Sequence, residues 1–155
     1  MTLSIAKQIE ELNELIHWDL DAVGAYNEAI ESVLEPMIRD PLIQFRSDHQ
    51  RHIADLSQVV RELGGKPPRK PDLKGMARRA MTKVAGLVGT ETVLHAMRSN
   101  EEAINQAYDH HLQFGFPQDV LDLIRRNFQD EQRHFEWVTQ ILRARPWETQ
   151  AESHP

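Results

Sequence analysis

The chain contains one five-residue motif twice. Residues 48–52 read Asp-His-Gln-Arg-His and residues 130–134 read Asp-Glu-Gln-Arg-His, so the two copies are 82 positions apart (130 − 48). The same offset relates two further pairs of residues, Asp19 to Glu101 and Tyr26 to Tyr108. Because both halves carry an acid, a tyrosine and this motif at one spacing, the sequence predicts two copies of one structural unit that pack against each other.

Four long segments show the periodicity of amphipathic helices. Apolar side chains recur every three or four residues, which places them on one helix face, along residues 5–33, 42–63, 94–112 and 120–141. A chain of 155 residues is long enough for one domain with a substantial core. We therefore expect an all-α four-helix bundle of two helix hairpins over residues 1–145, with a C-terminal tail at residues 146–155.

Turn-forming residues predict where these helices begin and end. The first helix should stop before Pro36, and a turn over residues 35–41 should precede the second. Thr90 can cap the third helix, Pro117 can open the fourth, and Pro146 blocks its extension.

A basic segment separates the two halves. Residues 66–83 contain seven Lys or Arg residues and one acid, Asp72. A bundle of two hairpins needs a long crossover between its second and third helices, and this segment lies at that position, with a short helix expected over residues 73–87. A solvated connector is the simpler interpretation, and a docking patch for an anionic partner is the alternative.

Six ionisable residues interrupt the apolar faces of the four helices. Burial of isolated charges costs several kcal/mol or more, so these residues need partners. Divalent metal ions would meet that need, because carboxylates and neutral imidazoles are both metal ligands. If the two halves are related by approximate two-fold symmetry, the six meet at one level of the core: Asp19, His49, His52, Glu101, Glu131 and His134.

Other ionisable residues fall outside this pattern. Asp21 faces away from Asp19 and is expected to be surface charge, and Glu102 lies off the buried face. Four histidines have no counterpart at the 82-residue offset, and we expect them to be solvated or at an interface: His17, His95, His110 and His111.

The combined motifs resemble the ferritin-like superfamily, in particular bacterioferritin- and rubrerythrin-type domains and small bacterial ferritin-like proteins. The resemblance covers about Leu12–Leu63 and Thr90–Leu142. It implies a ferritin-like four-helix bundle with a long crossover between helices two and three, and a carboxylate-bridged dinuclear metal site. The motifs that carry it are Asp19-x6-Tyr26, the stretch 48–52, Glu101-x6-Tyr108 and Asp130-Glu131-x-x-His134.

The resemblance also implies a role for each residue of the site. Asp19 and Glu101 correspond to terminal ligands, Glu131 to a bridging carboxylate, and His52 and His134 to the imidazole ligands. Asp48 and Asp130 correspond to acceptors of the histidines' second N–H group across the bundle. Two tyrosines either hydrogen-bond to the terminal acids or are ordinary packing residues: Tyr26 and Tyr108.

The chain departs from the family pattern at two positions. Asp19 replaces a longer glutamate, and His49 stands where a second bridging glutamate is expected, so the role of His49 as a ligand stays open. The carboxylates of Asp19, Glu101 and Glu131 sum to −3, compared with −4 for four acids. Two divalent ions would leave +1 and two trivalent ions +3. We therefore expect reduced dinuclear iron, a zinc or manganese pair, or a single metal rather than a stable diferric state.

Three functional hypotheses follow. The resemblance implies a dinuclear iron protein with oxidoreductase activity, in which Fe(II) reacts with O2 or peroxide. The alternative is a structural or interaction bundle held together by zinc or another divalent metal, which the substitution at His49 favours. A third is a metal-free bundle that binds partners through residues 66–83.

The amino-acid composition argues against several other kinds of protein and partner. The absence of cysteine excludes disulfides and the cysteine-ligated iron domain of a rubrerythrin-type electron relay. A net charge of −6 gives no reason to expect a nucleic-acid partner. No apolar run approaches membrane-spanning length, and residues 1–16 do not resemble a signal peptide, so we expect a cytoplasmic protein. A homodimer is compatible with a bundle of this size.

Overall fold

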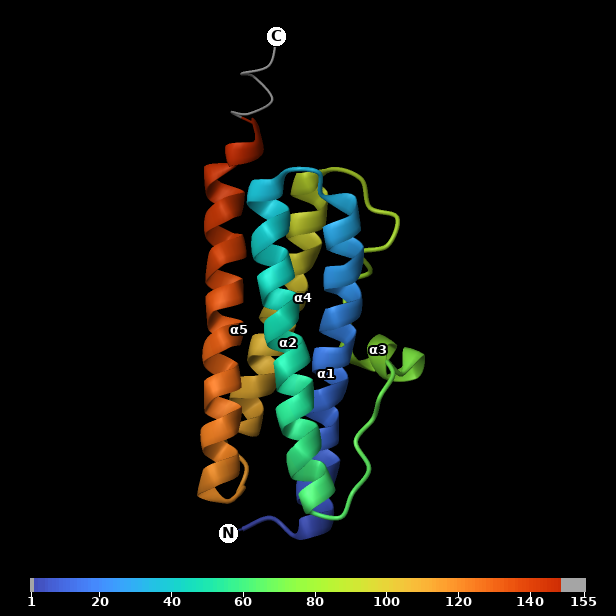
Figure 1. Cartoon of the computed structure of the whole chain (residues 1–155), viewed down its shortest axis with the longest axis vertical. Coiled ribbons are helices and arrows are strands. Elements are labelled where there is room, and N and C mark those ends of the chain that lie inside the picture. The colour runs from blue at the N-terminus through green and yellow to red at the C-terminus, as the bar shows by residue number, and fades with distance from the viewer. Residues whose placement is uncertain (1, 149–155) are drawn as a thin grey trace.

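A computed structural model describes residues 2–148, and this part of the chain is helical with no strand. Four long helices lie side by side as a bundle, and the short α3 lies outside it beside α1 (Figure 1). The expected all-α bundle of two hairpins is therefore confirmed. The helices are α1 (Ile5–Ser32), α2 (Pro36–Glu62), α3 (Leu73–Arg79), α4 (Thr90–His111) and α5 (Gln118–Ala144).

The two hairpins are α1 with α2 and α4 with α5, and they meet mainly through α1 and α4. Short links over residues 33–35 and 112–117 close the hairpins. The crossover over residues 63–89 runs along the length of the bundle, so that α2 and α4 point in the same direction (Figure 1). This connection brings the matching faces of the two halves together at mid-length.

The buried face of α1 follows the expected spacing along the middle of the helix, but the first residue of the predicted face is exposed. Leu12, Asp19 and Tyr26 are buried as the stripe requires, whereas Ile5 is 58% exposed. Ser4 caps the helix, because its hydroxyl accepts the N–H of Lys7 at 3.2 Å. The apolar stripe therefore places the centre of this helix correctly, and its exposed first residue contributes little to the core.

The start of α2 differs from the prediction. The expected turn over residues 35–41 is wrong, because α2 begins at Pro36 and includes Pro41. Proline is well tolerated at a first helical position, where its missing N–H has no intrahelical partner. Pro41 removes one bond, to the carbonyl of Met37 four residues earlier, close to the helix end. Thr90 likewise begins α4 rather than capping it, and its hydroxyl donates to Glu35 Oε2 at 2.7 Å.

The crossover helix α3 is shorter than the expected 73–87. It ends at Arg79, because Ala80 takes a left-handed backbone conformation with φ of 55°. The Arg79 side chain lies over Gly75, where a Cβ would meet Arg79 Nη1 at 2.8 Å. Its Nε donates to Asp21 Oδ2 at 2.7 Å. The expectation that Asp21 is surface charge is therefore wrong, since this residue is 1% exposed beneath the crossover.

His111 is a second residue that was expected to be solvated or at an interface and is instead buried within the chain. It is 4% exposed, and its Nδ1–H donates to the carbonyl of Ala107 at 2.7 Å. Its Nε2 lies 3.1 Å from Glu11 Oε2 on α1. His111 therefore links α4 to α1 at some distance from the central site.

Only the first three residues of the expected tail at 146–155 lie in the described part of the chain. Residues 146–148 form a further helical turn, and Trp147 is 9% exposed, whereas residues 149–155 lie outside the described part of the chain. Among the described helices, none is long and apolar enough to cross a membrane.

Candidate metal centre

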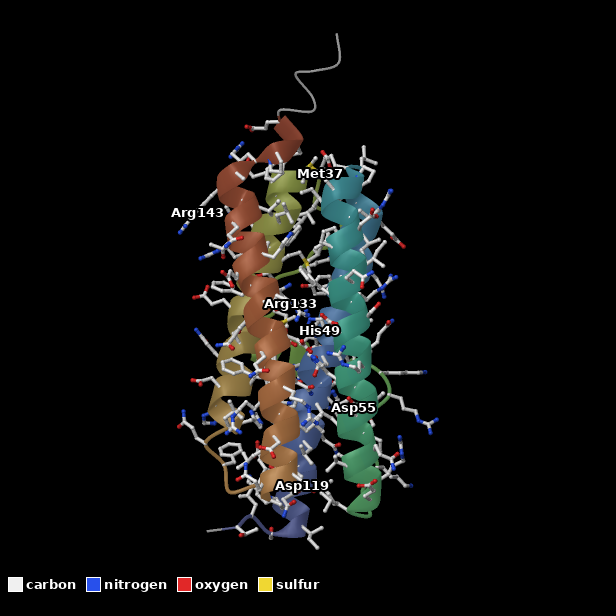
Figure 2. The ribbon with its side chains drawn as sticks, turned by 60° about the vertical axis from the view of Figure 1, so that its left-hand side comes forward. Met37, His49, Asp55, Asp119, Arg133 and Arg143 are labelled. Carbon is white, nitrogen blue, oxygen red and sulfur yellow. The ribbon has the colours of Figure 1, made fainter. Side chains whose placement is uncertain are left out.

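The six ionisable residues of the helix faces converge inside the bundle. They come from α1, α2, α4 and α5, and each is at most 1% exposed. His49 lies near the middle of the bundle's length, whereas Met37 and Asp119 lie near opposite ends (Figure 2). The residues brought together are Asp19, His49, His52, Glu101, Glu131 and His134.

Four of these residues form what we call the first cluster: Asp19, His49, His52 and Glu131. Asp19 Oδ1 lies 2.8 Å from His49 Nδ1 and 3.1 Å from His52 Nδ1. Glu131 Oε1 lies 3.2 Å from each of the same two nitrogens. Two oxygens and two nitrogens therefore surround one point in the core.

The second cluster consists of His49, Glu101, Glu131 and His134. Glu101 Oε1 lies 3.3 Å from His49 Nε2 and 3.7 Å from His134 Nδ1. Glu131 Oε2 lies 3.4 Å from His134 Nδ1. His49 and Glu131 thus belong to both clusters, and each presents a different atom to each one.

These spacings suit coordinated metal ions. Zinc binds nitrogen and oxygen ligands at about 2.0–2.2 Å, so the corners of a tetrahedral site are roughly 3.3 Å apart. The donor separations within the two clusters run from 2.8 Å for Asp19–His49 to 3.7 Å for Glu101–His134. The two overlapping clusters are therefore consistent with a dinuclear metal site of mixed carboxylate and imidazole ligands.

Unpartnered buried atoms provide a second test of the fit. Among the described residues, four side-chain atoms of the two clusters are buried without a hydrogen bond of acceptable geometry: Glu101 Oε2, Glu131 Oε1, Glu131 Oε2 and His134 Nδ1. A buried polar atom without a partner costs about 1–3 kcal/mol, and more if it is charged. Cations would partner these atoms, so the donor set fits a metal pair.

Two aspartates support histidines on the opposite hairpin. His134 Nε2 donates to Asp48 Oδ2 at 2.8 Å, and His52 Nε2 donates to Asp130 Oδ2 at 2.9 Å. Both bonds leave Nδ1 of the histidine facing the clusters. The resemblance to the ferritin-like superfamily implied acceptors at these two positions.

The two tyrosines also bond across the halves. Tyr108 donates to Asp19 Oδ2 at 2.6 Å, and Tyr26 donates to Glu101 Oε1 at 2.5 Å. Burial, followed by the neighbouring carboxylates Asp19 and Glu101, raises the pKa of each phenol well above its usual value, so both hydroxyls stay protonated. Hydrogen bonding rather than simple packing is therefore what distinguishes these residues.

Two arginines that were not among the predicted site residues, Arg51 and Arg133, also lie at the site. Arg133 donates to Asp48 Oδ2 at 2.7 Å and to Asp130 Oδ1 at 3.1 Å, and Arg51 bonds to the same two aspartates. Both arginines are half exposed, so they cover the histidine-bound aspartates on the solvent side. Their signal was in the sequence, since Arg51 and Arg133 occupy equivalent positions in the repeated motif.

Charge balance in the metal-free site depends on the histidines. Burial alone would lower the pKa of His49, but Glu131 and bonds to Asp19 and Glu101 outweigh it and raise the pKa to about 9. Burial would also lower the pKa of His52, but Asp19 and Asp130 outweigh this effect and raise the pKa to about 12. Protonated imidazoles therefore neutralise the carboxylates when no ion is bound, and metal binding must displace these protons.

Comparison with known proteins assigns the chain to a family. The family described as "Domain of unknown function (DUF2383)" matches residues 7–113, well over half of the chain. The chain belongs to this family. No curated protein matches this DUF2383 chain.

Solved structures show its fold. The crystal structure described as ferritin like, diiron-carboxylate proteins from Bacillus anthracis str. Ames is similar with a TM-score of 0.72 and 21% identity, covering 92% of this chain and 99% of that one. Dps from Thermosynechococcus elongatus is similar with a TM-score of 0.71 and 19% identity, covering 89% and 92%. The DUF2383 chain therefore has the ferritin-like fold.

Proposed function

We propose that this DUF2383 protein is a ferritin-like metal protein that holds two ions in its overlapping clusters, with iron as the leading candidate. With iron bound there, the protein would be an oxidoreductase whose oxidant is O2 or peroxide. One observation carries the proposal: three carboxylates and three imidazoles, each at most 1% exposed, meet at two points with donor spacings suited to metals.

Each residue has a defined part in the proposal. Asp19 and Glu101 are terminal ligands, Glu131 is shared, and His52 and His134 bind through Nδ1. Asp48 and Asp130 hold the two imidazoles in the required tautomer by accepting the Nε2–H. Tyr26 and Tyr108 orient the terminal carboxylates. Bound iron would supply electrons for reduction of the oxidant, while the apolar core around it limits access of water.

The Bacillus anthracis protein with the same fold is described as a diiron-carboxylate protein, which favours iron in this chain. A non-catalytic zinc bundle is the second candidate, and His49 favours it. An imidazole in place of a carboxylate lowers the negative charge available to stabilise ferric ions, while imidazole remains a good ligand for zinc.

Two measurements test the proposal. Elemental analysis of protein purified without added metal should show bound ions that are lost from His134→Ala and retained by His95→Ala, a matched control at a 63% exposed histidine. Rapid mixing of the Fe(II)-loaded protein with O2 or peroxide should then show oxidant consumption and a transient absorbance. Metal binding without oxidant consumption would support the zinc bundle, and no metal binding would refute both.

A further inference from the structure

The ring of His49 lies between the two clusters. Its Nδ1 is 2.8 Å from Asp19 Oδ1 and 3.2 Å from Glu131 Oε1, which belong to the first cluster. Its Nε2 is 3.3 Å from Glu101 Oε1, which belongs to the second. The ring is fully buried on α2 near the centre of the bundle (Figure 2). Each nitrogen therefore faces a different candidate ion position.

We propose that His49 is a bridging ligand, which binds one divalent ion through Nδ1 and a second through Nε2. The proposal rests on the dinuclear site proposed above and specifies how its two halves are joined. Glu131 is the matching bridge from α5, because its Oε1 faces the first cluster and its Oε2 faces the second.

The partners of the three histidines set His49 apart. His52 and His134 each commit Nε2 to an aspartate outside the clusters, which leaves one nitrogen for an ion. Within residues 2–148, both nitrogens of His49 contact only carboxylates that are themselves candidate ligands. In the part of the chain that the structure describes, no carbonyl or outlying acid bonds to either nitrogen, so the ring is placed to serve both clusters.

An alternative arrangement is a single ion at the first cluster, with Nε2–H of His49 donating to Glu101. That arrangement leaves His134 Nδ1 and Glu131 Oε2 without a partner, because neither atom makes a hydrogen bond among the described residues. It also adds a donor to Glu101 Oε1, which already accepts from Tyr26 at 2.5 Å. The bridging arrangement gives all of these atoms a partner.

Bridging also balances the charge of the site. An imidazole that binds an ion through each nitrogen has released both ring protons to solvent and carries −1. With the carboxylates of Asp19, Glu101 and Glu131 the ligand set then sums to −4, which two divalent ions neutralise. Two trivalent ions would leave +2 in a core where uncompensated charge is costly. The bridge therefore restores the −4 of a four-carboxylate ligand set, and its two nitrogens suit divalent ions that accept nitrogen ligands, such as zinc, cobalt or ferrous iron.

Zinc titration of chelator-treated protein tests the bridge. The wild type and His95→Gln should each bind two zinc ions per chain. His49→Gln should bind one, with affinity for the second reduced by about 100-fold or more, since even loss of a ligand's supporting partner costs 10–100-fold. His49→Glu, which restores a carboxylate able to bridge, should recover the second ion. Circular dichroism of each variant checks that it is folded.

A crystal grown with zinc provides a readout that does not depend on a variant. Anomalous scattering should show two peaks, one about 2.0–2.1 Å from Nδ1 of His49 and the other at that distance from Nε2. A peak beside only one of these nitrogens, or two ions retained with unchanged affinity in His49→Gln, would overturn the bridge while leaving metal binding intact. Absence of zinc from the wild type would instead refute the proposed function.

Discussion

Removal of the Tyr108 hydroxyl should destabilise the metal-free protein. In Tyr108→Phe the ring is retained, but Asp19 Oδ2 loses the 2.6 Å hydrogen bond that it accepts. Burial would raise the pKa of Asp19, but His52 and His49 lower it below its usual value, so this carboxylate is charged at pH 7. The substitution therefore leaves a charged oxygen in the core without the hydroxyl that solvates it.

The expected loss follows from the type of bond. Hydrogen bonds to charged groups contribute about 1.5–3 kcal/mol to the free energy of unfolding. A loss of about 2 kcal/mol corresponds to a decrease of about 4–8 °C in Tm for a chain of this size. Tyr26→Phe is a matched comparison from the other half of the repeat. Its acceptor, Glu101 Oε1, keeps a second contact with His49 Nε2 at 3.3 Å, so a smaller loss of about 1 kcal/mol is expected.

Urea unfolding of chelator-treated protein, followed by circular dichroism at pH 7, measures both losses. The dependence of the free energy on urea concentration should be the same in the wild type and both variants, because the surface exposed on unfolding is unchanged. The reasoning is refuted if Tyr108→Phe changes the free energy of unfolding by less than about 0.5 kcal/mol, the range of ordinary surface substitutions. A larger loss for Tyr26→Phe would refute the argument from alternative partners.

Three further outcomes are expected. Although His49 is buried, the carboxylates around it raise its pKa from 6.5 to about 9. The contribution of His49 to the free energy of unfolding is therefore fully present below pH 6.5 and is lost progressively as the pH rises through 9, which urea unfolding of metal-free protein should show. Zinc affinity should increase over the same pH range because fewer protons compete with the metal. Asp48→Asn should weaken zinc binding by about 10–100-fold in a competitive chelator titration, whereas Asp55→Asn, at an exposed position of the same helix, should not. Arg79→Met should lower the free energy of unfolding by about 3–5 kcal/mol because it leaves the buried Asp21 without its partner. Combination with Asp21→Asn should restore part of this loss. Strictly additive losses in the double variant would contradict the pairing of Arg79 with Asp21.

The convergence of the six site residues was predictable because two regularities act together. The three- and four-residue spacing assigns each residue to a buried helix face, and the 82-residue offset relates the two hairpins. The role of Asp48 and Asp130 came instead from the resemblance to the ferritin-like superfamily, while the 82-residue offset showed only that the two positions are equivalent. Helical geometry is regular over such distances, so side-chain direction follows from position in the sequence.

Other features could not be predicted because they depend on a partner from a distant element. Asp21 and Arg79 are 58 residues apart and form a buried pair only because the crossover folds back over α1. His111 is buried because Glu11 and α1 lie beside it. The helical path through Pro41 could not be predicted either, because a proline close to a helix start removes only one hydrogen bond and is compatible with a turn or a helix.

The sequence by itself determined the four helices, the two-fold relation between their halves and the level of the core at which carboxylates and imidazoles meet. Only the tertiary structure decided which atom of each side chain faces which neighbour, including the placement of Nδ1 and Nε2 of His49 toward different clusters. The physical reason is that helical periodicity determines the direction of a Cα–Cβ bond, whereas the rotation of a ring about that bond is set by the side chains of other helices that pack around it.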